Sequence, residues 1–282
     1  MSYTIRPMKL HDLMTAIEWA GYEGWNPGRH DLKSFYAADP NGFFLGEYEG
    51  KPVTTFSAVA YDASYGFVGF YIAHPDFRGR GLGLKIWEHG LNYLGKRTIG
   101  LDGVVAQQEN YRRSGFALAY RNARYQGVSP QPSSTLDANP SLVDARILPF
   151  PQLRDFDRHY HPAARDAFLS HWLAQPESIA LAHLENDALD GYGVIRPARD
   201  AWRIGPLFAR NEAAAISLFE GLIARIPGEK FAIDVPDANP AAVRLAKRFA
   251  LEPSFETARM YRGPAPQIDV TGIYGVTTLE LG

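Results

Sequence analysis

The 282-residue sequence contains no cysteine. This excludes disulfide frameworks, thiolate zinc sites, iron–sulfur clusters and catalysis through a cysteine acyl intermediate. No apolar run is long enough to span a membrane, and the first seven residues lack the apolar core of a signal peptide, so we expect a soluble cytoplasmic protein without a membrane partner. Lysine and arginine total 29 against 31 aspartates and glutamates, with no long basic run, so no nucleic-acid partner is expected.

What the sequence does contain is enough apolar material for a substantial core, with 46% hydrophobic and 13% aromatic residues. At about 100 to 200 residues per domain, the length favours roughly two domains. Residues 128–145 are rich in proline, serine, asparagine and aspartate and show no sustained period, which is typical of a linker. The sequence therefore predicts domains over 1–127 and 146–282.

Helical and strand patterns mix in the first half, which indicates an α+β architecture. Apolar periodicity and turn residues predict helices over 10–20, 31–38, 82–94 and 108–114, and strands over 43–48, 53–61, 65–72, 99–105 and 116–125. The first three strands are joined by short turns, as in an antiparallel meander.

The second half resembles a weak copy of the first. Three landmarks keep their order in both halves, with Gly69–Ala73 matching Gly205–Ala209, Leu101-Asp102 near Ile233-Asp234, and Ala123-Arg124 matching Ala258-Arg259. Chance similarity of short peptides is the alternative, but the conserved order favours an internal duplication.

The most informative segment is the glycine-rich loop 78–83, between a predicted strand and an amphipathic helix. Glycines at alternate positions let the backbone turn tightly and expose successive N–H groups beside a helix N-terminus, an arrangement that suits a pyrophosphate. The Lys-Ser/Thr of a mononucleotide P-loop is absent after Gly83, and the glycine spacing differs from that of a dinucleotide fingerprint. A structural turn with solvated arginines is the alternative for the loop taken alone.

The loop Arg78-Gly79-Arg80-Gly81-Leu82-Gly83 resembles the acyl-CoA pyrophosphate loop, Arg/Gln-x-x-Gly-x-Gly/Ala, of the GNAT N-acetyltransferase superfamily. The segment 70–75 resembles the family's preceding strand and its exit, and 110–116 is similar to its Tyr-x-x-x-Gly-Phe element. The resemblance covers most of residues 1–127 and is greatest to a two-domain bacterial subgroup. It implies tandem GNAT acyltransferase domains, each a mixed, largely antiparallel sheet flanked by helices.

The resemblance also implies acetyl-CoA as co-substrate and no metal. In the superfamily, the exit of the fourth strand pairs with the pantetheine arm and the glycine loop holds the pyrophosphate. The residues that carry over these roles are Ile72, Ala73, Arg78, Gly79, Arg80, Gly81, Leu82 and Gly83. Tyr111 is the candidate general acid for the departing CoA thiolate, because its hydroxyl is protonated at neutral pH.

The acceptor-binding candidates are Glu23, Trp25, Asn26 and Asp102. Trp25 offers a flat apolar or cation–π wall, and Asn26 offers both a donor and an acceptor. No single base stands out among Glu23, Asp102 and Glu109, and each carboxylate also fits a solvated or capping role. Asp102 lies in an apolar strand, where burial is costly unless a partner is present.

The second half departs from the family pattern at the loop. Residues 209–215 contain no glycine there, Glu212 lies where phosphate would bind, and Ala246 falls opposite Tyr111. We therefore expect a degenerate GNAT-like domain without CoA, which shapes the acceptor pocket or stabilises the first domain. The apolar tail 272–281 predicts a last strand, which either completes the second sheet or crosses to the first and brings Glu280 near the acceptor.

These features together predict an N-acetyltransferase that moves acetyl from acetyl-CoA directly to a primary amine, on a small molecule or a protein. The alternative is a non-catalytic acyl-CoA sensor, and a homodimer is left open. Three histidines, His159, His161 and His171, superficially suggest a metal site, but no carboxylate lies at ligand spacing and we expect none.

Overall fold

The computed structural model describes residues 2–131 and 139–282. The strands are β1 (Tyr3–Pro7), β2 (Phe43–Tyr48), β3 (Lys51–Ala60), β4 (Tyr65–Ala73), β5 (Thr98–Val104), β6 (Ala117–Val128), β7 (Leu142–Asp144), β8 (Ile179–Glu185), β9 (Ala188–Arg196), β10 (Trp202–Ala209), β11 (Lys230–Pro236), β12 (Glu252–Arg262) and β13 (Ile273–Gly275). The helices are α1 (Leu13–Tyr22), α2 (Asp31–Ala38), α3 (Leu82–Leu94), α4 (Gln108–Arg113), α5 (Phe150–Asp157), α6 (Asp166–Leu173), α7 (Glu212–Ile223) and α8 (Pro240–Arg248). Among them, none has the length and apolar character that a bilayer crossing requires.

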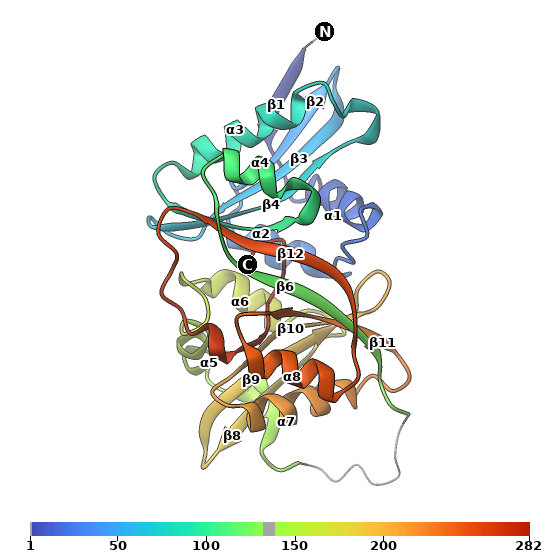
Figure 1. Ribbon diagram of the computed structural model, residues 1–282, viewed down its shortest axis with the longest axis vertical. Coiled ribbons are helices and arrows are strands. Elements are labelled where there is room, and N and C mark those ends of the chain that lie inside the picture. The colour runs from blue at the N-terminus through green and yellow to red at the C-terminus, as the bar shows by residue number, and fades with distance from the viewer. Residues whose placement is uncertain (1, 132–138) are drawn as a thin grey trace.

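The strands form one 13-stranded sheet that runs through both halves of the chain. Its order is β1-β2-β3-β4-β5-β12-β6-β11-β10-β9-β8-β7, and β13 pairs with β10. Figure 1 shows the consequence, because β6 and β12 cross the middle of the molecule between the two halves. The last long strand of each half pairs with a strand of the other half: β12 lies between β5 and β6, and β6 lies between β12 and β11. This arrangement is called the strand exchange below.

Two buried ion pairs mark this strand exchange. Arg259 on β12 lies opposite Asp102 on β5 and binds its carboxylate through two hydrogen bonds of 2.8 and 2.7 Å. Arg124 on β6 lies opposite Asp234 on β11 and makes the equivalent bonds of 2.7 and 3.0 Å. These four residues are the landmarks of the internal repeat, so the repeat preserves the pairs that join each exchanged strand to its neighbour.

The halves also share a hydrophobic core. One cluster combines α1 and α2 of the first half with α5 and α6 of the second, and Phe35 stacks on Trp172 with ring centroids 6.1 Å apart. Separate clusters join α3 and α4 to the sheet in the first half, and α7 and α8 in the second. Successive residues of β4 pack into different clusters: Phe70 belongs to the shared cluster, and Tyr71 packs against the cluster of α3. This follows because successive side chains of a strand point to opposite faces of the sheet.

The predicted α+β class and tandem organisation are confirmed, and the first-half elements match within a few residues. The sequence analysis missed β1. It also assigned residues 128–145 to a linker, whereas β7 (142–144) lies inside that range and pairs with β8. Residues 132–138 of that segment lie outside the described residues. The strand predicted over 272–281 is also too long, because only β13 (273–275) is strand.

Candidate active site

The site begins where β4 and β5 separate. These two parallel strands pair from Tyr65 and Thr98 as far as Val68 and Leu101, and beyond that point they no longer pair with each other. The register with β3 also shifts here, and Phe70 has a positive φ of 45°. A wedge is thereby opened inside the sheet between the two strands.

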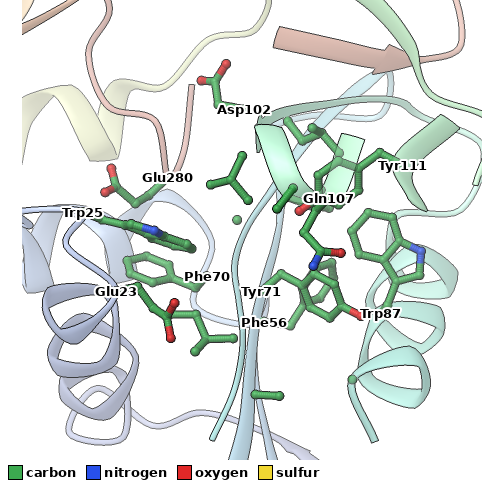
Figure 2. A pocket seen from close by; sticks show the side chains of 18 of the residues that line it. Glu23, Trp25, Phe56, Phe70, Tyr71, Trp87, Asp102, Gln107, Tyr111 and Glu280 are labelled. Atoms are coloured by element: carbon green, nitrogen blue, oxygen red, sulfur yellow. The ribbon is translucent and has the colours of Figure 1, made fainter. Parts of the chain in front are cut away.

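A cavity of about 610 Å³ occupies this wedge. Its lining comes from both halves of the chain and is mostly aromatic and aliphatic. The lining residues are Glu23, Trp25, Phe56, Val68, Gly69, Phe70, Tyr71, Ile72, Ala73, Phe77, Arg78, Gly79, Gly81, Leu82, Gly83, Leu84, Trp87, Leu101, Asp102, Val104, Ala106, Gln107, Tyr111, Phe255, Thr257, Leu279 and Glu280. Figure 2 shows Trp25, Phe70 and Glu280 on one side of the cavity and Tyr111 and Trp87 on the other.

The glycine loop forms one end of the cavity. Gly79 and Gly81 have φ values of 75° and 73°, a left-handed conformation that side chains other than glycine adopt only with strain. Gly81 precedes α3 without any side-chain cap, so the first N–H groups of that helix are available to a ligand. All of the predicted CoA-contacting residues line the cavity except Arg80, whose guanidinium lies over the Phe77 ring at 4.8 Å.

An ion pair spans the space between the glycine loop and α1. The guanidinium of Arg78 donates one hydrogen bond to the carbonyl oxygen of Ala73 at 3.0 Å and another to the carboxylate of Glu23. Both charged side chains are partly exposed and both line the cavity. The pair therefore joins the predicted cofactor loop to the predicted acceptor loop.

Tyr111 lines the cavity from α4. Its ring is buried and stacks on Trp87 with centroids 5.4 Å apart. Burial raises the pKa of the Tyr111 hydroxyl above its ordinary value, so this group carries its proton throughout the neutral range. A fixed, protonated hydroxyl facing a cavity is able to donate a hydrogen bond to a developing anion.

The predicted acceptor residues separate into two groups. Glu23, Trp25 and Asp102 line the cavity, whereas Asn26 does not. Asn26 has a φ of 54°, and its side chain accepts from the Asp200 N–H at 2.7 Å and donates to the Ala201 carbonyl at 3.1 Å. It therefore attaches the loop that carries Trp25 to the β9–β10 turn of the second half.

The carboxylate of Asp102 has partners, as its burial requires. Besides its two bonds to Arg259, it accepts from the Asn122 amide at 2.8 Å. Burial nevertheless raises its pKa above the ordinary value, because one arginine only partly offsets the desolvation. Glu109 lies outside the cavity lining and pairs with Arg112 at 3.3 Å.

Sequence reasoning missed several lining residues. Trp87, Tyr71 and Phe56 fit the apolar stripes of their elements, and such a stripe does not distinguish a cavity wall from a core position. Three others come from the second half: Phe255 and Thr257 on β12, and Leu279 near the C-terminus. Glu280 also lines the cavity, in agreement with the crossing route that the sequence left open for the tail. The only signal for the β12 pair is their place just before the Ala258-Arg259 landmark.

The corresponding wedge of the second half is filled. β10 and β11 pair as far as Ile204 and Ile233 and then separate, but β13 lies against β10 there, and the Val276 N–H donates to the Asp234 carbonyl at 2.9 Å. The loop position holds Asn211, which caps α7 by accepting from the Ala214 N–H at 2.9 Å. The chain itself thus occupies the position that the open wedge has in the first half.

Within residues 2–131 and 139–282, histidines and acidic residues form no group of three or more able to hold a metal ion. His161 is fully buried, and burial together with nearby Arg165 lowers its pKa to about 3. Its Nδ1 lies 2.8 Å from the Ala163 carbonyl, so this ring is a neutral core element.

Comparisons with known proteins agree with this geometry. Residues 10–117 match the model of the acetyltransferase (GNAT) family, and residues 153–275 match that of an acetyltransferase (GNAT) domain. The chain is 32% identical over its whole length to holothin acyltransferase of Pseudoalteromonas sp. (strain SANK 73390), of which it covers 95%.

Solved structures with low sequence identity share the fold. A putative acetyltransferase from Pyrococcus horikoshii is 20% identical with a TM-score of 0.82, over 99% of this chain and 96% of that one. A tandem GNAT protein from the clavulanic acid biosynthesis pathway is 14% identical with a TM-score of 0.65, over 94% of this chain and all of that one.

Proposed function

The chain belongs to the GNAT acyltransferase superfamily, and on that premise we propose that its first half transfers an acetyl group from acetyl-CoA directly to a primary amine. The observation that carries the proposal is the continuous cavity that runs from the glycine loop, through the opening between β4 and β5, to Tyr111 and Trp25. The chain is an acyltransferase by its full-length similarity to one, so the alternative of a non-catalytic sensor is dropped.

In this proposal the pyrophosphate of CoA lies on the N–H groups of the loop 79–83, and the pantetheine arm follows the exit of β4 at Ile72 and Ala73. Beyond Val68, β4 pairs with no strand on that side among the described residues, so the amides of the arm can approach its backbone once Arg78 releases the Ala73 carbonyl. Arg78 would exchange Glu23 for a phosphate oxygen, and an exposed ion pair of this kind costs little to break.

The reaction needs a polarised thioester carbonyl and a proton for the leaving thiolate. We assign the first role to a backbone N–H at the exit of β4 near Ile72 or Ala73. We assign the second to the Tyr111 hydroxyl, which faces the same cavity and stays protonated. The amine attacks the carbonyl carbon and the C–N bond forms, while a base removes one proton from the nitrogen. The C–S bond breaks as the thiolate takes the Tyr111 proton.

The acceptor is proposed to be a small-molecule amine. The cavity of this chain is walled by aromatic side chains, which suits a compact acceptor, and the Pseudoalteromonas relative is named holothin acyltransferase. A screen tests the proposal: acetyl-CoA and longer acyl-CoA thioesters are combined with aromatic amines, polyamines, amino acids and a lysine peptide, and the free thiol is measured. Acetyl transfer to an amine is expected, and no thiol release with any pair would contradict it.

We predict that one chain binds one CoA. Because β13 and Val276 fill the second wedge, the first half alone has room for a pantetheine arm within residues 2–131 and 139–282. Titration calorimetry with acetyl-CoA is expected to give a stoichiometry of one per chain. Two equivalent sites would show that β13 leaves its place and that the second half also binds the cofactor.

A second prediction concerns Gly81. Replacing Gly81 with alanine forces a side chain into the left-handed conformation, which costs roughly 1 to 2 kcal/mol, and relief of this strain moves the loop. We expect the KM for acetyl-CoA to rise about tenfold. Gly50 is the matched control, because its φ of 76° and the open space around it are similar but it lies in the β2–β3 turn away from the cavity. Gly50→Ala should lower stability similarly and leave the KM unchanged.

A further inference from the structure

The C-terminal segment, defined here as residues 276–282, crosses from the second half into the first. The Tyr61 hydroxyl donates to the Leu281 carbonyl at 2.8 Å, and Arg165 donates to the Gly282 carbonyl at 3.2 Å. A methyl group on Gly69 of β4 would approach the Glu280 carbonyl oxygen to 2.1 Å, so the segment passes directly against the strand that opens the wedge. The backbone that carries Glu280 is therefore fixed beside the cavity.

Glu280 lines the cavity, yet its carboxylate has no hydrogen-bond partner among the described residues. The side chain is buried, both oxygens are unpartnered, and the nearest cationic atom is Nη1 of Arg203 at 3.8 Å. Burying a carboxylate without hydrogen bonds is costly. A group retained in this state is a candidate for binding or catalysis.

Four other buried carboxylates show how this protein satisfies a structural charge. Asp31, Asp102, Asp157 and Asp234 each accept at least two hydrogen bonds from an arginine, at distances between 2.7 and 3.1 Å. Glu280 accepts none from Arg203, whose Nη2 is already bonded to Asp234. Because no hydrogen bond holds either oxygen, the Glu280 side chain can turn into the cavity without breaking one.

Glu280 lies beside an excess of positive charge. Arg124 on β6 and Arg203 on β10 share the single carboxylate of Asp234 on β11, which leaves one positive charge uncompensated. Glu280 is the next acidic group that acts on both arginines. A carboxylate in this environment can receive a proton from a substrate and return it to water.

The neighbours of Glu280 indicate what kind of substrate reaches it. Trp25 and Phe70 lie on its side of the cavity, across from Tyr111 (Figure 2). Phe255 adds a third aromatic ring to the lining, and the Thr257 hydroxyl, also in the lining, has no partner among the described residues. Flat apolar walls with unpartnered oxygen atoms complement a compact aromatic amine that brings N–H donors.

We propose that Glu280 is the proton acceptor for the amine, and that the acceptor substrate is a small primary amine joined to an aromatic ring by a short alkyl chain. The proposal rests on the proposed acetyl transfer. The amine nitrogen attacks the thioester carbon, one nitrogen proton passes to the Glu280 carboxylate, and the thiolate takes the Tyr111 proton. A water then carries the proton from Glu280 back to Tyr111, so the enzyme ends as it began. The second half thus supplies a catalytic residue.

The test replaces Glu280 with glutamine and uses tryptamine, tyramine and benzylamine as probe amines. At neutral pH we expect kcat with the best probe to fall about 10²-fold or more. The deficit should shrink as the pH rises, because hydroxide then takes the nitrogen proton in place of the missing carboxylate. The Kd for acetyl-CoA should stay within about twofold of the parent value, because the cofactor occupies the other end of the cavity.

Glu256→Gln is the matched control, since Glu256 lies in the second half but is exposed and pairs with Arg121 at 3.2 Å. Glu280→Asp keeps the carboxylate and should recover part of the rate if the glutamine variant folds poorly. A Glu280→Gln variant as fast as the parent, or one with the same deficit at every pH, overturns the base role while leaving acetyl transfer intact. A parent that acetylates other amines but none of the three probes overturns the substrate class, and a parent that acetylates none overturns both proposals.

Discussion

Replacing Tyr111 with phenylalanine is expected to lower kcat by about 10² to 10⁴, which is the usual contribution of a general acid. The ring and its stacking on Trp87 remain, so the variant should fold and bind acetyl-CoA like the parent. Steady-state kinetics with free-thiol detection gives kcat, and calorimetry with CoA gives the affinity. A loss confined to kcat identifies the hydroxyl as a group that acts in the transition state.

Tyr71→Phe is the control for this experiment. Tyr71 also lines the cavity, and burial raises its pKa as well, but it lies on β4 near Gly83 and has no assigned role in proton transfer. We expect its kcat to change by less than about threefold. Equal losses in both variants would mean that the hydroxyls shape the cavity and that neither donates the proton.

The pH profile gives an independent check on Tyr111. Burial raises its pKa, so the protonated acid persists as the pH rises past the ordinary tyrosine value. Loss of the acid should therefore not limit kcat anywhere in the neutral or mildly alkaline range. An alkaline decrease in kcat near neutrality that disappears in Tyr111→Phe would contradict this environment.

The sequence predicts the first half of this protein well because its signals are local. Turn residues, strand alternation and the helix stripe define the elements around the glycine loop, and α2, β2 and α3 begin and end where expected. The loop glycines at 79 and 81 have the left-handed conformations that their spacing suggests. Each of these features depends on neighbours a few residues apart.

The strand exchange could not be predicted in the same way. Whether 117–128 pairs with β5 or with β11 depends on contacts between residues more than a hundred positions apart, and a strand's own alternation does not select its partner. The repeated Asp and Arg landmarks were visible, but their meaning as ion pairs across the exchange needs the three-dimensional register. For the same reason the sequence predicts that Asn26 binds the acceptor, whereas in the structure Asn26 attaches its own loop to the second half.

The acceptor end of the cavity was hidden from the sequence for a related reason. The tail pattern indicates a strand, but only 273–275 pairs, and the following residues cross to the first half. Sequence analysis left this crossing open as one of two routes. In the structure, β13 and Val276 fill the second wedge, and the residues that follow lie against β4 of the first half.

The largest expected effect on stability follows from replacing Asp234 with asparagine. Asp234 is buried and holds both Arg124 and Arg203, so its loss leaves two buried guanidinium groups without a hydrogen-bonded carboxylate, and the remaining acidic group, Glu280, lies 3.8 Å from Arg203. Removing one partner of a buried ion pair typically costs about 3 to 5 kcal/mol, and here the free energy of unfolding should fall by at least that amount. Urea unfolding followed by circular dichroism measures the change.

The effect should depend on pH in a defined direction. Desolvation of Asp234 is outweighed by Arg124 and Arg203, which lower its pKa to about 2. A carboxyl whose pKa is depressed on folding stabilises the protein above its unfolded pKa of about 3.9, and this contribution is lost as the pH falls through the folded value. The difference in unfolding free energy between the parent and Asp234→Asn should therefore have its full size at neutral pH and become smaller below about pH 4.

Asp12→Asn is the matched control. The hydrogen bond from Arg6 outweighs desolvation and lowers the pKa of Asp12 to about 2, as for Asp234, but the arginine partner of Asp12 is exposed. Its removal should cost no more than about 1 kcal/mol. Equal losses of unfolding free energy in the two variants would show that burial of the ion pairs at the strand exchange is not what makes Asp234 important.

The two arginines that Asp234 holds also contact the acceptor loop. Arg124 and Arg203 donate to the carbonyl of Trp25 at 2.8 and 3.2 Å, so Asp234→Asn should also loosen the acceptor wall and raise the KM for the amine. Stability and acceptor binding would then fall together, since the ion pairs that join the exchanged strands also hold the loop against which the substrate binds.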